Sequence, residues 1–229
     1  MNFHVLTIFP ELFSSFLRTG IVRIALESRA AAVTLYDIRD FTEDRHRSVD
    51  DKPYGGGPGM LMKVEPVVRC VEDVVARNSL SSYRNVMLSP QGSVFCQEKA
   101  AELVEDENVI LICGRYEGFD ERIRKILKPE EVSIGDFVLS GGELPAMVLM
   151  ESVIRLVPGV LGSNESLQNE SFEGNRLEGP QYTRPETFRG YSVPEVLLSG
   201  NHQKIKAWRE TAALKRTEQR RKDLLGVQL

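Results

Sequence analysis

The sequence contains few of the residues that build metal and disulfide sites. Histidine occurs only at positions 4, 46 and 202, and no group of His, Cys and Asp has the spacing of a metal site. The three cysteines, Cys70, Cys96 and Cys113, are odd in number and far apart. We therefore expect reduced thiols, as in a cytoplasmic protein, and neither disulfides nor structural zinc.

Long apolar runs and the common nucleotide-binding signatures are also missing. No run of about 18 apolar residues predicts a transmembrane helix, and the first residues lack the basic region and cleavage site of a signal peptide. There is no G-x-G-x-x-G after a strand, no G-x-x-x-x-G-K-[ST] and no G-x-S-x-G. These absences argue against dinucleotide, P-loop and serine-hydrolase sites, and we expect a cytoplasmic protein without a membrane partner.

Charge is distributed unevenly along the chain, whose net charge is −4. Residues 181–229 contain ten Lys or Arg and five Asp or Glu, a net charge of +5, so the preceding residues carry −9. Such an asymmetry indicates that the basic part meets a polyanion, and a solvated helical face is the simpler alternative.

Strand patterns alternate with helical patterns over most of the chain, which predicts an α/β fold with a parallel sheet covered by helices on both faces. With 229 residues, the chain fits one large domain or a medium domain with a small one. Strands are expected at residues 2–9, 32–36, 84–88, 109–113 and 132–134. Helices are expected at residues 10–19, 21–27, 64–76, 97–104 and 120–127, and from Glu143 onward.

Three consecutive strands end in polar loops that contain glycine, at residues 89–92, 114–118 and 134–142. Ligands of parallel sheets bind at the carboxyl ends of the strands, so three such loops predict one pocket. Backbone groups and few charges would suit an adenosine-containing ligand held by main-chain hydrogen bonds and apolar contacts.

The amino-acid composition of the chain changes after residue 161. Residues 162–179 are polar with isolated large apolar residues, which is typical of a flexible linker. Helical patterns then follow at residues 201–211 and 214–225 and predict a small basic helical module.

Eight segments together resemble one family, the bacterial tRNA (guanine-N1)-methyltransferases of the SPOUT class. They are FPELF (9–13), DKPYGGGPGM (51–60), LSPQG (88–92), CGRYEG (113–118), IGDFVLSGGE (134–143), PGVLG (158–162), YTRPE (182–186) and LLSGNH (197–202). The resemblance implies a deep trefoil knot in the parallel α/β sheet, followed by a small all-helical C-terminal domain. The implied parts are a catalytic domain at 1–161, a linker at 162–179 and a tRNA-binding domain at 180–229.

The same resemblance implies that S-adenosylmethionine binds in the three loops. The implied cofactor residues are Leu88, Ser89, Pro90, Gln91, Gly114, Tyr116, Glu117, Gly118, Ile134, Gly135, Asp136, Phe137, Val138, Leu139, Gly141, Gly142 and Pro145. It also implies a homodimer with active sites shared between subunits, and a Mg²⁺ requirement for which the sequence shows no site. The implied macromolecular partner is tRNA and not DNA.

The implied reaction methylates N1 of the guanosine at tRNA position 37, next to the anticodon. N1 carries a proton, so methylation needs a base, and the resulting charge on O6 needs a cation. The family's base is an Asp in a D-S-[FH] motif. Here Glu170-Ser171-Phe172 matches this motif, with a stem one methylene longer. Arg155 matches a family Arg on the guanine oxygen side, and Tyr182, Arg184, Lys215 and Arg216 are expected to contact tRNA.

Two competing hypotheses remain. A non-catalytic RNA-binding protein with a vestigial pocket would bind no cofactor, and the intact loops and the carboxylate at position 170 count against it. A nucleotide-dependent oxidoreductase would fit a doubly wound sheet, but the dinucleotide fingerprint is absent.

Overall fold

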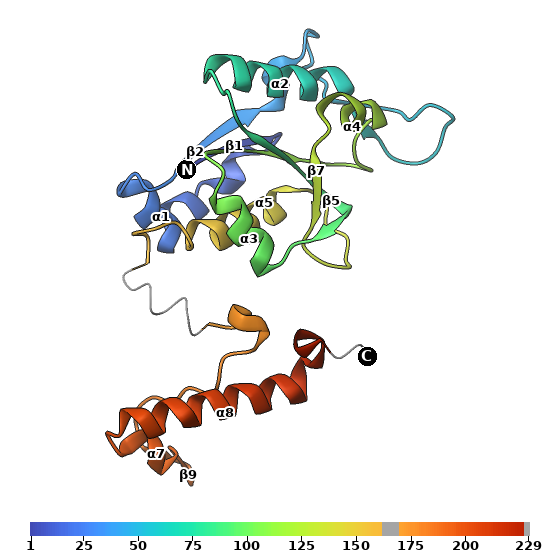
Figure 1. Cartoon of the computed structure of the whole chain (residues 1–229). Helices are drawn as coiled ribbons and strands as arrows, with labels where there is room; N and C mark the ends of the chain where they lie inside the picture. Colours follow the sequence, from blue (N-terminus) through green and yellow to red (C-terminus); the bar gives the residue numbers. More distant parts are fainter. Residues whose placement is uncertain (162–169, 227–229) are drawn as a thin grey trace. The chain divides into compact units, whose positions relative to one another are not determined.

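The computed structural model describes residues 1–161 and 170–226. The chain divides into two compact units, Met1–Gly162 and Ser163–Leu229, and each is described by itself. The first unit is built on a five-stranded, fully parallel sheet with the order β2-β1-β6-β5-β7 (Figure 1). Its strands are β1 (Asn2–Thr7), β2 (Ala32–Asp37), β5 (Arg84–Val94), β6 (Asn108–Cys113) and β7 (Glu130–Ser133).

Helices cover both faces of this sheet because successive strand residues point to opposite sides. On the central strand β6, Val109 and Leu111 join one apolar cluster, whereas Ile110 and Ile112 join the other. The first cluster includes α1 (Gly20–Glu27), α3 (Gln97–Val104) and α5 (Glu143–Ile154), and the second includes α2 (Val64–Arg77) and α4 (Glu121–Leu127) (Figure 1). The predicted parallel α/β architecture is confirmed.

Strand β5 continues through the loop that was predicted at residues 89–92. Leu88 and Ser93 both lie opposite Val132 of β7, so the four residues between them bulge out of the ladder. A Cβ atom at Gly92 would lie 2.3 Å from the carbonyl carbon of Glu131, which explains why a residue without a side chain occupies this close approach. The loop is thus a bulge within β5, and the strand resumes its pairing with β7 beyond it.

The prediction of one helix over residues 10–19 is wrong. Two 3-10 turns, η1 (Pro10–Phe13) and η2 (Phe16–Arg18), take its place. Ser14 and Ser15 separate them, and serine competes with helical hydrogen bonding. Gly20 has φ +58°, a backbone conformation that would interrupt a continuous helix into α1.

The segment between β2 and α2 carries short regular pieces. They are η3 (Ile38–Phe41), β3 (Asp50–Asp51) and β4 (Leu61–Met62), and β3 pairs with β4 in antiparallel fashion. The Gly-rich residues 53–59 lie between these two strands, and Tyr54 there is 99% exposed.

The second unit contains one long helix where two were predicted. Helix α8 (His202–Arg220) begins after Asn201, whose side chain accepts a hydrogen bond from the Lys204 backbone at 3.1 Å. The expected break falls at Ala212 and Ala213, and alanine is the strongest helix former. The other elements are η4 (Glu173–Asn175), β8 (Thr187–Phe188), β9 (Tyr191–Ser192), α7 (Glu195–Leu198) and η5 (Lys222–Leu225).

The expectation of an all-helical second unit is also wrong, because β8 and β9 form an antiparallel hairpin. Of the predicted linker, residues 162–169 lie outside the described part of the chain, whereas residues 170–179 are attached to α8 by hydrogen bonds at Leu177 and Glu178. The Leu177 backbone donates to Thr217 Oγ1 at 2.9 Å, and Arg216 donates to the Glu178 carbonyl at 3.2 Å. In the two described segments, no helix is long and apolar enough to cross a membrane.

Candidate active site

The three predicted loops meet around one cavity of about 360 Å³ at the carboxyl ends of β5, β6 and β7. All of the predicted cofactor residues line it except Asp136, which is exposed on the third loop. Those lining residues are Leu88, Ser89, Pro90, Gln91, Gly114, Tyr116, Glu117, Gly118, Ile134, Gly135, Phe137, Val138, Leu139, Gly141, Gly142 and Pro145. The loops thus supply mostly backbone and apolar groups, which is typical of a small-molecule site.

Two of the loops are joined directly at Gly142. Its backbone N–H donates to the Gly114 carbonyl at 2.8 Å. A Cβ atom at this position would come within 2.8 Å of the Cys113 Cα, so only glycine allows this approach without a backbone shift. The cavity wall at this point is therefore two backbones in contact.

The second loop is supported from behind by β4. The Glu117 backbone donates to the Met60 carbonyl at 2.9 Å, and the Met62 backbone donates to the Gly118 carbonyl at 2.8 Å. Met60 belongs to the Gly-rich segment that resembles the family motif DKPYGGGPGM. These bonds place the base of that segment beside the cavity.

A buried carboxylate connects three elements behind the cavity. Glu143, the first residue of α5, has a side chain only 1% exposed. Its Oε1 accepts a hydrogen bond from Thr7 Oγ1 at 2.8 Å, and its Oε2 pairs with Arg115 Nε at 2.9 Å. A buried charge requires such partners, and the N-terminus of a helix also favours a carboxylate. The pair fixes Arg115, which lines the cavity, to β1 and α5.

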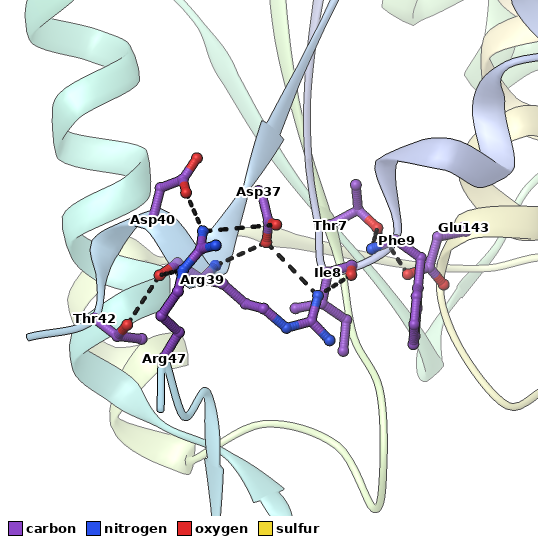
Figure 2. A network of polar contacts seen from close by, with 9 residues as sticks. All are labelled: Thr7, Ile8, Phe9, Asp37, Arg39, Asp40, Thr42, Arg47 and Glu143. Atoms are coloured by element: carbon purple, nitrogen blue, oxygen red, sulfur yellow. Dashed lines mark hydrogen bonds and ion pairs between the residues drawn. The ribbon is translucent and has the colours of Figure 1, made fainter. Parts of the chain in front are cut away.

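The aromatic ring of Phe9 connects Arg115 to Arg39, which belongs to the segment after β2. The Arg115 guanidinium lies 4.6 Å from the centre of the Phe9 ring, and the Arg39 guanidinium lies 5.3 Å from it. Arg39 also donates to the Ile8 carbonyl (Figure 2). Cations attract the faces of aromatic rings, so these contacts hold the chain after β1 in place.

Asp37 and Arg47 complete the network that Figure 2 shows. Asp37 accepts a hydrogen bond from the Arg39 backbone at 2.9 Å, which caps η3, and it also lies 4.0 Å from Arg47. Arg47 pairs with Asp40 as well. The polar residues that follow β2 are thus paired with one another, and exposed pairs of this kind contribute little each.

Arg124 of α4 orders the part of the cavity wall next to β5 and β7. It binds Glu131 through two nitrogens at 2.9 and 3.0 Å and reaches Gln91 Oε1 at 3.4 Å. The hydrogen bond to Glu131 holds the pKa of Arg124 above its ordinary value. A bidentate arginine–carboxylate pair fixes the orientation of the guanidinium as well as adding charge attraction. Arg124 therefore connects Gln91 in the bulge of β5 to Glu131 of β7.

Besides Arg124, two further titratable groups at or near the cavity have raised pKa values. Burial raises the pKa of the Cys113 thiol well above its usual range, so this cysteine stays protonated and is not a nucleophile. Burial, followed by the nearby Asp50 carboxylate, raises the pKa of Tyr116. Neither group provides a base at neutral pH.

The two predicted catalytic residues fall in different units. Arg155 is the C-cap residue of α5 in the first unit. Glu170 is half-buried in the second unit, where its carbonyl accepts a hydrogen bond from the Glu173 backbone at 3.4 Å. Ser171 Oγ accepts a hydrogen bond from the Glu178 backbone at 3.1 Å, so the Glu-Ser-Phe tripeptide begins an ordered turn.

The predicted tRNA-binding residues all lie in the second unit. Tyr182 is exposed and its ring centre lies 6.3 Å from that of Trp208 on α8. Arg184 and Lys215 are exposed, whereas Arg216 is half-buried and donates to a carbonyl. Three of the four side chains are thus accessible on the unit's surface.

Seven residues that line the cavity were not among the individually predicted cofactor residues: Arg115, Phe119, Glu121, Arg124, Val132, Ser133 and Ser140. Arg115 and Ser140 lie inside two of the predicted loops, whereas the other five lie outside them. Arg115 was visible inside the motif CGRYEG, and its charge in a glycine loop was the available signal. Arg124 carried no such signal, because its partner Glu131 lies on another element.

The fold and the cavity define a class: an α/β protein with a ligand-sized cavity at the carboxyl ends of its parallel strands. The family model of tRNA (guanine-1)-methyltransferase TrmD matches residues 1–227. The chain belongs to this family of methyltransferases.

Individual relatives agree with this assignment. A tRNA (guanine-N(1)-)-methyltransferase of Moorella thermoacetica is 53% identical over 99% of this chain and 90% of its own length. Proteins of the same name from Carboxydothermus hydrogenoformans and Geobacillus kaustophilus are 52% and 50% identical, over 99% and 98% of this chain and 88% and 91% of their own lengths.

Proposed function

We propose that this chain transfers a methyl group from S-adenosylmethionine to N1 of the guanosine at tRNA position 37. The observation that carries the proposal is the convergence of three family-like loops on one cavity, in a chain that matches the methyltransferase family over residues 1–227. The parallel sheet fits the SPOUT class, and we assign the chain the trefoil knot of that class.

The cavity suits S-adenosylmethionine by its chemistry. Leu88, Val138, Leu139 and Pro145 offer apolar contacts for an adenine ring, while the backbone groups of the loops offer hydrogen bonds. The bound cofactor supplies a methyl group on a positively charged sulfur. The hydrogen bond between Gly142 and Gly114 holds two of the loops close together. Groups of both loops can therefore contact one bound ligand.

Glu170 takes the proton from guanine N1. Without this step N1 is a poor nucleophile, and a positioned carboxylate is a suitable base. The ordered turn that follows Glu170 supports the role, because a base must be held in place to act. The negative charge that develops on guanine O6 is stabilised by the Arg155 guanidinium.

The second unit provides the affinity for tRNA. Its net charge of +5 over residues 181–229 attracts phosphates, and Tyr182, Arg184, Lys215 and Arg216 are the contacts that we assign. We divide the chain into a catalytic domain at 1–161, a linker at 162–179 and a tRNA-binding domain at 180–229. The protein acts in the cytoplasm as a homodimer, and each active site uses residues of both subunits.

Mg²⁺ is not assigned a role. Among the described residues, no group of three or more His, Cys, Asp or Glu side chains could hold a metal ion.

Calorimetric titration separates this proposal from its alternatives. We expect S-adenosylmethionine to bind the protein at one site per chain and NADH not to bind. Gly142→Leu, which fills the contact with Gly114, serves as a control that should lose binding of the cofactor. No binding of S-adenosylmethionine would favour a non-catalytic RNA-binding protein, and binding of NADH would favour an oxidoreductase.

A further inference from the structure

The β8–β9 hairpin of the second unit presents two aromatic rings on one face. Its turn residues, Arg189 and Gly190, have φ values of +51° and +83°, the signs of a type I′ turn, whose twist suits a two-residue hairpin. Phe188 and Tyr191 lie directly opposite each other in the ladder. Side chains at opposite positions project from the same face, so both rings are presented on one side of the hairpin.

These rings are exposed although the hairpin itself is ordered. Phe188 is 62% exposed and Tyr191 is 84% exposed. Thr187 Oγ1 and Ser192 Oγ lie 3.0 Å apart in a hydrogen bond across the strands, and the Val193 backbone donates to the Glu186 carbonyl at 2.9 Å. Backbone and hydroxyl contacts therefore hold the hairpin, and the rings contribute little packing.

Positive charge accompanies the rings. The Arg189 guanidinium lies 5.3 Å from the centre of the Phe188 ring, and Arg184 precedes the hairpin on an exposed segment. The same end of the unit contains α7 and the first turns of the basic helix α8 (Figure 1). Aromatic rings beside cations are how proteins hold unpaired nucleotides, because bases stack on the rings and phosphates meet the cations.

We propose that the face formed by Phe188 and Tyr191 is a stacking platform for an unpaired nucleotide of the bound tRNA. The inference rests on the proposed function for the identity of its ligand. Charge complementarity selects this ligand over an apolar protein surface, since residues 181–229 carry +5. Every base has a π face, so the platform tolerates any base and strengthens binding without reading sequence.

The test is the affinity of the full-length protein for fluorescein-labelled tRNA, measured by fluorescence anisotropy over a salt series. Phe188→Leu and Tyr191→Leu keep apolar bulk but remove the π face, and we expect each to weaken binding about 5- to 150-fold, the range for one lost stacking contact. The slope of log K against log salt should stay unchanged, because a ring displaces no counterions. Lys215→Ala, in contrast, should flatten that slope by about 0.7 to 0.9.

Two controls make the result specific. Tyr191→Phe keeps the ring and should bind tRNA as the unchanged protein does. Leu198→Ala removes another side chain of the same unit that is 51% exposed, and it should also leave the tRNA affinity unchanged. Unchanged tRNA affinity in both Phe188→Leu and Tyr191→Leu overturns the inference. A change in the oligomeric state of these two variants that accounts for their lost tRNA affinity overturns it as well. Failure of the unchanged protein to methylate tRNA refutes the proposed function separately, while its tRNA affinity still tests the platform.

Discussion

Replacing Glu170 by Gln is expected to slow methyl transfer about 10²- to 10⁴-fold in single-turnover experiments, the usual contribution of a general base. Glutamine keeps the size and polarity of the side chain but cannot accept the N1 proton. Because Glu170 acts on the proton rather than on binding, the affinities for tRNA and S-adenosylmethionine should change little. Rapid-quench assays with radiolabelled methyl donor measure the rate.

Two matched variants accompany this experiment. Glu173→Gln changes an exposed carboxylate in the same turn and should leave the rate unchanged. Glu170→Asp restores the residue type of the family motif and should retain most of the rate. A near-normal rate in Glu170→Gln would show that water or another group takes the proton.

Replacing Arg115 by Met is expected to lower the free energy of unfolding by about 3–5 kcal/mol, the typical cost of leaving a buried charge unpaired. The Glu143 carboxylate, 1% exposed, would retain only the Thr7 hydroxyl among the partners described here. Urea unfolding, followed by circular dichroism, measures the change. Because Arg115 lines the cavity, the variant should also bind S-adenosylmethionine more weakly.

The ion pair between the exposed Arg122 and the half-buried Asp120 provides the matched control. The Arg122 side chain is 61% exposed, so Arg122→Met should lower the free energy of unfolding far less than Arg115→Met does. Adding Glu143→Gln to Arg115→Met removes the stranded charge and should recover a large part of the lost stability. A cost below 1 kcal/mol for Arg115→Met itself would mean that the buried pair does not hold these elements together.

The sheet could be predicted from the sequence because its central strands contain runs of buried apolar residues. In β6, every residue from Asn108 to Cys113 is buried, and such a run indicates a strand covered on both faces. The three loops could be placed because polar residues and glycine follow each of the three preceding strands within a few positions. That pattern depends only on neighbouring residues, so the cavity was accessible to sequence reasoning.

The polar network behind the cavity could not be predicted in the same way. Thr7 and Glu143 are separated by 136 positions, and Arg115 and Glu143 by 28. No local period connects such residues, and only the packing of α5 against the sheet brings them together. A buried charge pair is thus a consequence of the fold rather than a signal in the sequence.

The second unit shows a different limit. The hairpin strands have two residues each, too few to display an alternating pattern, although Gly190 between Phe188 and Tyr191 is a typical turn residue. The prediction of a break between two helices within α8 was wrong for another reason. The helical pattern continues through Ala212 and Ala213, and no residue there ends a helix.

Mapping of methylated nucleosides in tRNA tests the central claim most directly. Unmodified tRNA transcripts with guanosine at positions 36 and 37 are incubated with the protein and S-adenosylmethionine, digested and analysed by mass spectrometry, beside transcripts with adenosine at position 37. The proposal predicts 1-methylguanosine at position 37 of the first set and no methylation of the second. Methyl groups at a ribose 2′-oxygen, on another base or at another position, or no methylation at all, would contradict it.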